Sequence, residues 1–292
     1  MTYDLTGRVV VITGAARGIG EQTARAAAAA GAHVALVGLE PERLAALAGE
    51  LGPPHAWFEC DVTDQAALDR AVEGVTTTFG GIDAVVANAG VVNIGTAAVC
   101  PVEAQVRTID VNLLGVVRTV CATLPQVIER RGYYLLVSSL AAFTVLPGMA
   151  AYCASKAGVE QYGNALRLEV AHKGVAVGTA HMTWIDTDLV RDARDDLSSV
   201  GQIRSRLPGP LGANLSAGEC ARAFVRGISR RSRRVFVPRS LAVVELLRPI
   251  ILGPVGNLVL RRPAARAVPE LEDEVRQLGR SFGRNSVALR PD

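Results

Sequence analysis

The chain has no long uncharged apolar run and very little lysine. No stretch of its 292 residues reaches the roughly 18 apolar residues that a simple membrane-spanning helix needs. Residues 1–7 have neither the basic nor the apolar segment of a secretory signal. Lys156 and Lys173 are the only lysines among 31 basic residues. We therefore expect a cytoplasmic protein, in which a lysine serves a purpose that arginine does not.

Cysteine and histidine lack the clustering that a metal site needs. The five cysteines are odd in number, scattered and in no Cys-x-x-Cys pair, and the four histidines are equally dispersed. This spacing is typical of free, mostly buried thiols in a reducing compartment. We expect no metal ion.

The net charge of +3 is unevenly distributed, because 14 arginines oppose six acidic residues from Arg226 to the end. Such a surplus indicates an anionic partner, or else reflects the preference of the whole chain for arginine. Neither interleaved aromatic residues nor a nucleic-acid-binding motif accompanies it, so we do not expect nucleic acid as a partner.

Short apolar runs alternate with helical patterns, which predicts βαβ units and a parallel sheet. The predicted fold class is α/β: a single doubly wound Rossmann-type domain over 1–238, with a seven-stranded parallel sheet flanked by helices, and a C-terminal extension over 239–292. The polar, broken segment 186–212 predicts a mobile loop or lid. The expected strands are 9–12, 33–37, 55–60, 83–87, 133–138, 175–181 and 235–237, and the expected helices are 18–30, 42–51, 64–79, 102–131, 151–172 and 216–229.

A glycine-rich turn, Thr13-Gly-Ala-Ala-Arg-Gly-Ile-Gly20, joins the first strand to the first helix. Glycine at 14, 18 and 20 lets the backbone turn sharply and lets a pyrophosphate approach the helix N-terminus. The strand before it and the helix after it are the context that a dinucleotide motif requires. Without Gly-Lys-Ser/Thr it is not a P-loop. Glycines in such turns also serve packing alone, so the turn needs support from elsewhere.

Two further segments follow strands on the same sheet edge. Asp61-Val62 follows the third strand, where a carboxylate can accept a hydrogen bond from an adenine amino group, and Asn88-Ala-Gly90 ends the fourth. Each segment alone is as consistent with a turn or a helix cap.

Tyr152 and Lys156 are four residues apart in a helical pattern and so share one face. A neighbouring ammonium favours the phenolate, and a tyrosine with a lowered pKa can exchange a proton with a carbonyl or an alcohol. The alternative is an ordinary amphipathic helix with an exposed lysine.

Taken together, these motifs resemble the short-chain dehydrogenase/reductase family over about residues 5–238. The resemblance rests on TGxxxGxG at 13–20, Asn88-Ala-Gly90, Asn112, Ser139 and the Tyr152-x-x-x-Lys156 pair, in order and spacing. It implies an NAD(P)-dependent oxidoreductase that interconverts an alcohol and a ketone or aldehyde, and a homo-oligomer.

The resemblance also implies roles for these residues. Ser139 would hydrogen-bond the reacting oxygen, Tyr152 would be the acid/base, Lys156 would lower the Tyr152 pKa and bind the nicotinamide ribose, and Asn112 would hold a water. Ser138 is an alternative to Ser139, since strand alternation points the two side chains oppositely. The residues expected to bind the cofactor are Gly14, Arg17, Gly18, Ile19, Gly20, Gly38, Asp61, Val62, Asn88, Ala89, Gly90, Tyr152, Lys156 and Thr187.

One segment departs from the family pattern. Met182-Thr183 stands where the family usually has Pro-Gly, while Thr187 keeps the place of the threonine that contacts the nicotinamide amide. The departure raises the alternative of a catalytically weak dinucleotide-binding or sensor protein, docked to a membrane or a partner.

The cofactor choice depends on the end of the second strand, where Gly38-Leu39-Glu40 lacks the aspartate that selects NAD. Arg17 could meet a 2′-phosphate, although Leu39 occupies the family's other phosphate-binding position. We expect NADP in preference to NAD.

The apolar segment 241–260 is flanked by Arg239, Arg261 and Arg262. Glu245, Pro249 and Pro254 argue against a spanning helix, so two short apolar segments are expected, with a short helix from Glu270. They would cover the substrate pocket, contact another subunit, or make a peripheral membrane contact through 239–262. Each arrangement favours an apolar substrate, whose identity the sequence does not indicate.

Overall fold

A computed structural model of the chain describes residues 3–188, 191 and 214–279. Most of the predicted loop over 186–212 and the chain after Gly279 lie outside these described residues.

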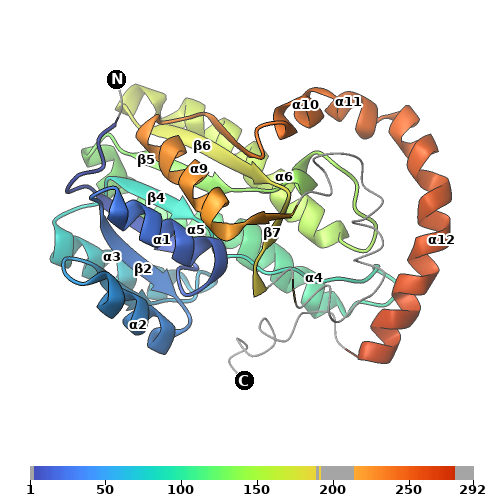
Figure 1. The fold of residues 1–292 in the computed structure, drawn as a ribbon, viewed down its shortest axis with the longest axis horizontal. Coiled ribbons are helices and arrows are strands. Elements are labelled where there is room, and N and C mark those ends of the chain that lie inside the picture. The colour runs from blue at the N-terminus through green and yellow to red at the C-terminus, as the bar shows by residue number, and fades with distance from the viewer. Residues whose placement is uncertain (1–2, 189–190, 192–213, 280–292) are drawn as a thin grey trace.

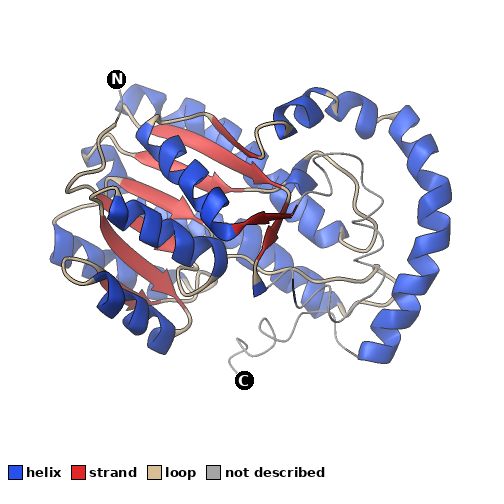
Figure 2. Ribbon diagram, in the orientation of Figure 1, coloured by secondary structure: helices blue, strands red, loops and turns tan. Residues whose placement is uncertain are grey.

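Seven parallel strands form one sheet in the order β3-β2-β1-β4-β5-β6-β9 (Figures 1 and 2). A two-stranded parallel sheet, β7 with β8, lies beside it. The predicted seven-stranded parallel sheet is therefore confirmed, whereas the small sheet was not foreseen. The strands are β1 Val9–Thr13, β2 His33–Gly38, β3 Ala56–Glu59, β4 Ala84–Ala87, β5 Tyr133–Val137, β6 Ala176–Met182, β7 Trp184–Asp186, β8 Asn214–Ser216 and β9 Arg234–Val237.

Helices cover both faces of the sheet (Figure 2). They are α1 Gly18–Ala29, α2 Pro41–Leu51, α3 Gln65–Phe79, α4 Val102–Ile109, α5 Gly115–Glu129, α6 Ala150–Val170, α9 Ala217–Ser229, α10 Leu241–Leu246, α11 Arg248–Ile251 and α12 Pro254–Leu278.

Two apolar cores lie on opposite faces of the sheet, and β1 shows why. Val10 and Ile12 pack with α1, α2 and α9 on one face, while Val9 and Val11 pack with α3, α5 and α6 on the other. A strand buried on both faces needs a continuous apolar run, which is the pattern at 9–12.

The strand order reverses direction between β1 and β4. In an open parallel sheet, ligands bind at the carboxyl ends of the strands at such a switch point. The glycine-rich turn after β1 and the Asn88 segment after β4 both lie there.

The helical stretch Val102–Glu129 is long and apolar enough to cross a membrane. It packs instead against α3 and α6, as a core helix does. The continuous helix predicted over 102–131 is present over Val102–Glu129, but its middle turn, Asp110–Leu114, is π-helical and lies between α4 and α5.

The C-terminal extension differs from the prediction. The helices are interrupted at Gly253-Pro254, as expected of a Pro/Gly break, but the helix expected to begin at Glu270 is the end of α12, which runs from Pro254 through Pro263 and Pro269 to Leu278. The amino-terminal half of α12 is largely exposed, so the carbonyl groups that a proline leaves unpaired can bond water.

Candidate active site

The turn after β1 requires glycine for two separate reasons. Gly14 and Gly18 have φ angles of 65° and 58°, in the left-handed region. A Cβ atom at Gly14 would lie 2.9 Å from the Cα atom of Ala89, and one at Gly20 would lie 2.1 Å from the Gly14 carbonyl oxygen. The turn is therefore packed tightly against the segment after β4.

Asn88 fastens these two segments together. Its backbone N–H donates to the Thr13 hydroxyl at 3.0 Å, and its side-chain amide donates to the Thr13 carbonyl at 3.0 Å. Asn88 thus fixes the end of β1, where the glycine-rich turn begins, to the segment after β4.

One cleft runs along this edge of the sheet and contains almost every residue expected in the site. Two expected residues, Gly20 and Asn112, are buried and are not part of its lining. The expected residues that line the cleft are Gly14, Arg17, Gly18, Ile19, Gly38, Asp61, Val62, Asn88, Ala89, Gly90, Ser138, Ser139, Tyr152, Lys156 and Thr187.

The cleft fits a dinucleotide. Helix α1 begins at Gly18 without a side-chain cap, so the N–H groups of its first turn point toward an anion site. Glu40, after β2, and Tyr152, on the helix after β5, both line the cleft, and β1 and β4 lie between those two strands. Among the described residues, no group of three or more His, Cys, Asp and Glu side chains is placed to hold a metal ion.

Asp61 uses part of its carboxylate within its own turn. One oxygen accepts from the Thr63 N–H and from the Thr63 hydroxyl, both at 2.8 Å. The second oxygen lies 4.0 Å from the Arg107 guanidinium. Asp61 is therefore fixed in orientation at the cleft wall.

Arg17 has a different partner from the one that the sequence suggested. Its guanidinium makes a two-point contact with the Glu40 carboxylate, with Nε donating to Oε2 at 2.7 Å and Nη2 donating to Oε1. Asp188 adds a second carboxylate 3.9 Å from Nη1. Arg17, which was expected to bind a 2′-phosphate, therefore pairs with the carboxylates of Glu40 and Asp188.

Tyr152 lies in the first turn of α6, beside Ser139 at the end of β5. Burial raises the pKa of Tyr152 above its ordinary value, and a hydrogen bond with the Ser139 side chain acts in the opposite direction. Ser139 itself accepts from the Ala141 N–H at 3.2 Å. The two hydroxyl groups thus meet at the cleft.

Lys156 is 4% exposed, and its Nζ donates to the Val137 carbonyl at 3.0 Å. Burial lowers its pKa to about 8. Nζ lies 5.7 Å from the centre of the Tyr152 ring. The Tyr–Lys spacing predicts a lowered tyrosine pKa, but here burial decides the direction and the net shift is upward.

Asn112 sits in the π-helical turn, a feature frequent at functional sites. Its side-chain oxygen accepts from the Val91 N–H at 2.8 Å, and its amide donates to the Val91 carbonyl at 2.9 Å and to the Ser155 hydroxyl at 3.2 Å. Asn112 thereby holds the strand-like segment after Gly90 against α6.

Ser138 and Ser139 have different partners. The Ser138 hydroxyl donates to the Lys156 carbonyl at 2.8 Å in the interior, whereas Ser139 is the serine that bonds the Tyr152 side chain. Of the two alternatives, Ser139 is the one in contact with Tyr152.

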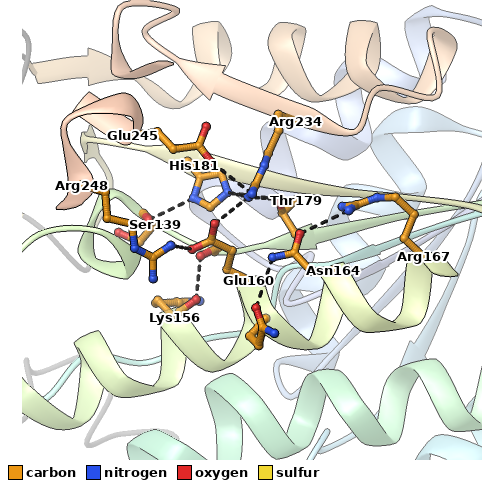
Figure 3. A network of polar contacts seen from close by, with 12 residues as sticks. Ser139, Lys156, Glu160, Asn164, Arg167, Thr179, His181, Arg234, Glu245 and Arg248 are labelled. Carbon is orange, nitrogen blue, oxygen red and sulfur yellow. Dashed lines mark hydrogen bonds and ion pairs between the residues drawn. The ribbon is translucent and has the colours of Figure 1, made fainter. Parts of the chain in front are cut away.

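A buried polar network behind Ser139 has no counterpart in the sequence analysis (Figure 3). His181 Nδ1 lies 3.2 Å from the Ser139 carbonyl oxygen, and its Nε2 lies 3.0 Å from Arg234 Nη1. Because an arginine can only donate, Nε2 must accept, which leaves the proton on Nδ1 to donate to Ser139. Burial lowers the pKa of His181 to about 4, so the ring is neutral at neutral pH.

Glu160 anchors the same network from α6. Its carboxylate accepts from Arg234 at 2.8 Å and from Arg248 at 2.9 Å, and Arg234 also pairs with Glu245 at 3.0 Å. These residues are separated by up to 88 positions in the chain. No local pattern could have revealed the network.

The Met182-Thr183 departure leaves the sheet intact. β6 continues through Met182, and the Thr183 N–H donates to the Val237 carbonyl at 3.1 Å. Both residues line the cleft together with Thr187. The substitution for Pro-Gly therefore changes the side chains at the cleft while β6 keeps its pairing with β9.

The carboxyl-terminal half of α12 covers the Tyr152 end of the site. Leu271 and Val275 are buried in an apolar cluster to which Tyr152 and Trp184 also belong. The Thr96 hydroxyl donates to Glu272 on the same helix at 2.6 Å. Other members of the cluster are Val92, Ile94, Val99, Met149 and Leu278.

Comparison with known proteins agrees with this geometry. A family model described as short chain dehydrogenase matches residues 8–198. D-threitol dehydrogenase of Mycolicibacterium smegmatis is 36% identical over 197 residues, which cover 66% of this chain and 76% of that protein. 11-beta-hydroxysteroid dehydrogenase 1A of Arabidopsis thaliana is 33% identical over 259 residues, covering 83% and 72%. The chain spans only 15% of another relative, glycine betaine reductase ATRR of Emericella nidulans, at 36% identity.

Solved structures share the fold. A short chain dehydrogenase/reductase from Burkholderia phymatum, in complex with NAD, superposes with a TM-score of 0.76 at 22% identity, covering 86% of this chain and 96% of that one. A short-chain type dehydrogenase/reductase from Mycobacterium marinum gives 0.72 at 27% identity, covering 81% and 96%. The chain therefore belongs to the short-chain dehydrogenase/reductase family and is an oxidoreductase that acts on alcohol groups.

Proposed function

We propose that the protein is an NAD-dependent dehydrogenase that reversibly interconverts an apolar secondary alcohol and its ketone. The observation that carries the proposal is the meeting of Ser139, Tyr152 and Lys156 in the cleft that also holds the glycine-rich turn. When bound, the nicotinamide dinucleotide accepts or supplies the hydride.

Tyr152 is the proposed acid/base. In the oxidation direction its phenolate accepts the hydroxyl proton of the alcohol, and in the reduction direction its phenol returns that proton to the carbonyl oxygen. Ser139 donates a hydrogen bond to the same substrate oxygen, so the oxygen is held between two hydroxyl groups.

Lys156 and Asn112 support this chemistry. A lysine with a pKa of about 8 carries a proton over part of the neutral range and would donate hydrogen bonds to the ribose hydroxyls of a bound cofactor. As an ammonium it favours the Tyr152 phenolate and so counters the effect of burial. Asn112 holds the Val91 backbone and, through Ser155, ties that segment to α6.

NAD is the proposed cofactor, in place of the NADP that the sequence favoured. Glu40 stands at the end of the cleft where the adenosine ribose would lie, with its carboxylate engaged by Arg17. A 2′-phosphate would have to displace Glu40 from Arg17 and remain beside that carboxylate and Asp188, a like-charge arrangement. A ribose hydroxyl has no such conflict and can donate to Glu40.

An apolar substrate is proposed because Tyr152 packs against an apolar cluster and because Val91, Met182 and Ile185 line the same cleft. Apolar walls bury an alkyl or ring skeleton favourably and offer few partners to additional hydroxyl groups. The names of the two dehydrogenase relatives indicate substrates of opposite polarity, a steroid and a polyol. The composition of this cluster favours the steroid-like class.

The test is a screen of NAD reduction, followed at the nicotinamide absorbance band, with secondary alcohols of graded apolarity and with polyols. We expect turnover that increases with apolar surface and is faster with NAD than with NADP. Turnover confined to polyols would contradict the proposed substrate class, and no turnover with either cofactor would contradict the function.

A further inference from the structure

The extension presents most of the exposed apolar side chains in the described part of the chain. Eight of the 14 large hydrophobic residues that are exposed there lie between positions 243 and 259. Leu246, Leu258 and Val259 are 79%, 76% and 65% exposed. We call these eight residues, with Arg261, Arg262 and Arg266, the docking surface; the eight are Val243, Leu246, Leu247, Ile250, Leu252, Val255, Leu258 and Val259.

The charge of this segment has one sign. Between Glu245 and Glu270 the sequence contains no acidic residue and four arginines. Arg248 pairs with Glu160, whereas Arg261, Arg262 and Arg266 are exposed. Apolar side chains bordered by arginines complement a surface that is apolar inside and anionic outside.

Helical spacing places both kinds of side chain on one side of α12. Val255, Leu258, Val259, Arg262 and Arg266 follow the spacing of three and four residues that defines one helix face. The arginines come nearer the end of the helix that packs on the body of the protein.

Both ends of the extension contact the body of the protein. Leu241 and Val244 are buried beside Phe143, while Glu245 pairs with Arg234 and Arg248 pairs with Glu160 (Figure 3). At the far end, Leu271 and Val275 are buried. Helices α10 to α12 arch along one side of the molecule between these anchors (Figure 1). The exposed apolar side chains of the docking surface lie between these two anchors.

A lipid surface fits these observations better than a second copy of the chain. In a symmetric contact the same patch faces itself, which would bring arginines against arginines with no acidic residue between them. Anionic headgroups pair with the arginines instead. The extension is interrupted between α11 and α12 at Gly253-Pro254 and is bordered by arginines, which suits a position in the membrane interface and not a spanning one.

We propose that the docking surface binds the protein peripherally to bilayers that contain anionic lipid. The same helix that contacts the bilayer through Leu258 reaches the Tyr152 cluster through Leu271 and Val275. Docking therefore brings the catalytic end of the cleft near a reservoir of apolar alcohols and ketones.

The experiment is sedimentation of the full chain with phosphatidylcholine vesicles, with and without phosphatidylglycerol, at low and high salt. We expect binding to the anionic vesicles that weakens with salt. The variant Arg261→Gln/Arg262→Gln/Arg266→Gln and the variant Leu258→Asp/Val259→Asp should each bind at least about tenfold more weakly. Arg70→Gln, at an exposed arginine on α3, and Leu168→Asp, at a leucine 80% exposed on α6, are the matched controls.

Thermal unfolding and NAD binding of every variant should match those of the parent chain, because the docking surface lies outside the cleft. Equal binding to both kinds of vesicle, or unchanged binding by the two docking-surface variants, would overturn the proposal. So would light scattering showing that Leu258→Asp/Val259→Asp converts a dimer to a monomer, because the surface would then join two copies. Turnover of a water-soluble alcohol tests the proposed function separately.

Discussion

Arg248, at the start of α11, donates a hydrogen bond of 2.9 Å to the carboxylate of Glu160 on the catalytic helix α6. Glu160 lies four residues after Lys156, which lies four after Tyr152, so one side of α6 carries all three. Glu160 is 2% exposed and also accepts from Arg234 at 2.8 Å. The pair therefore ties the C-terminal extension to the helix that carries the chemistry.

Replacing Glu160 by glutamine should destabilise the fold. The change removes the negative charge on which Arg234 and Arg248 converge and leaves their charges poorly compensated. Since both arginines are partly exposed, we expect a loss of about 2 kcal/mol in the free energy of unfolding. Denaturant unfolding measures it, with Glu73→Gln, at an exposed site on α3, as the control. If Glu160→Gln lost no more unfolding free energy than Glu73→Gln, the Glu160 carboxylate would not be needed to stabilise the two arginines.

His181 should make the fold sensitive to acid. Its pKa is lowered to about 4 by burial, so as pH falls below the ordinary histidine value of about 6.5 the unfolded chain takes up the proton first. Stability should fall between about pH 6.5 and 4, by about 1.4 kcal/mol for each pKa unit of difference. His181→Asn keeps a donor for Ser139 but does not titrate, so its unfolding free energy should change less over this interval. An equal acid slope in both proteins would show that other groups cause it.

Glu40 should decide between the two dinucleotides. Glu40→Gln removes the carboxylate while Arg17 keeps its positive charge, so the affinity for NADP relative to NAD should rise at least about tenfold. Fluorescence titration with each cofactor measures the ratio. Glu42→Gln, an exposed carboxylate on the first turn of α2, should leave the ratio unchanged. An unchanged ratio in Glu40→Gln would mean that another part of the cleft selects the cofactor.

The two neighbouring serines should separate catalysis from stability. Ser139→Ala removes a donor to the reacting oxygen, and kcat should fall about 100-fold or more. Ser138→Ala removes a buried bond to the Lys156 carbonyl, which should cost about 1 kcal/mol of stability with a smaller effect on kcat. Steady-state kinetics and thermal unfolding of both variants provide the comparison. The reverse pattern would make Ser138 the serine that faces the substrate.

The sheet and the cleft were predictable because their signals are local. The run Val9 to Ile12 requires burial on both faces, the glycine positions follow from a tight turn, and the four-residue spacing of Tyr152 and Lys156 fixes their shared face. Parallel strands then bring their carboxyl ends to a single edge. Short-range rules therefore determine most of the site.

The features that the sequence did not predict depend on contacts between distant segments. Glu40 captures Arg17 across 23 positions, and Arg234 reaches Glu160 across 74. The upward shift of the Tyr152 pKa depends on how deeply the folded chain buries it. Helix α12 continues through Pro263 and Pro269, although a proline inside a helix removes a backbone hydrogen bond. In each case, contacts between segments far apart in the sequence outweigh the preference of the local sequence.

The central claim is that Tyr152 transfers the proton while the rest of the cleft binds the cofactor. The most direct test is kcat/KM of Tyr152→Phe for the best alcohol, measured together with the NAD dissociation constant. The account predicts a fall of about 100- to 10,000-fold in kcat/KM with cofactor binding close to that of the parent chain. Retained turnover in Tyr152→Phe would contradict the assignment of this tyrosine as the acid/base.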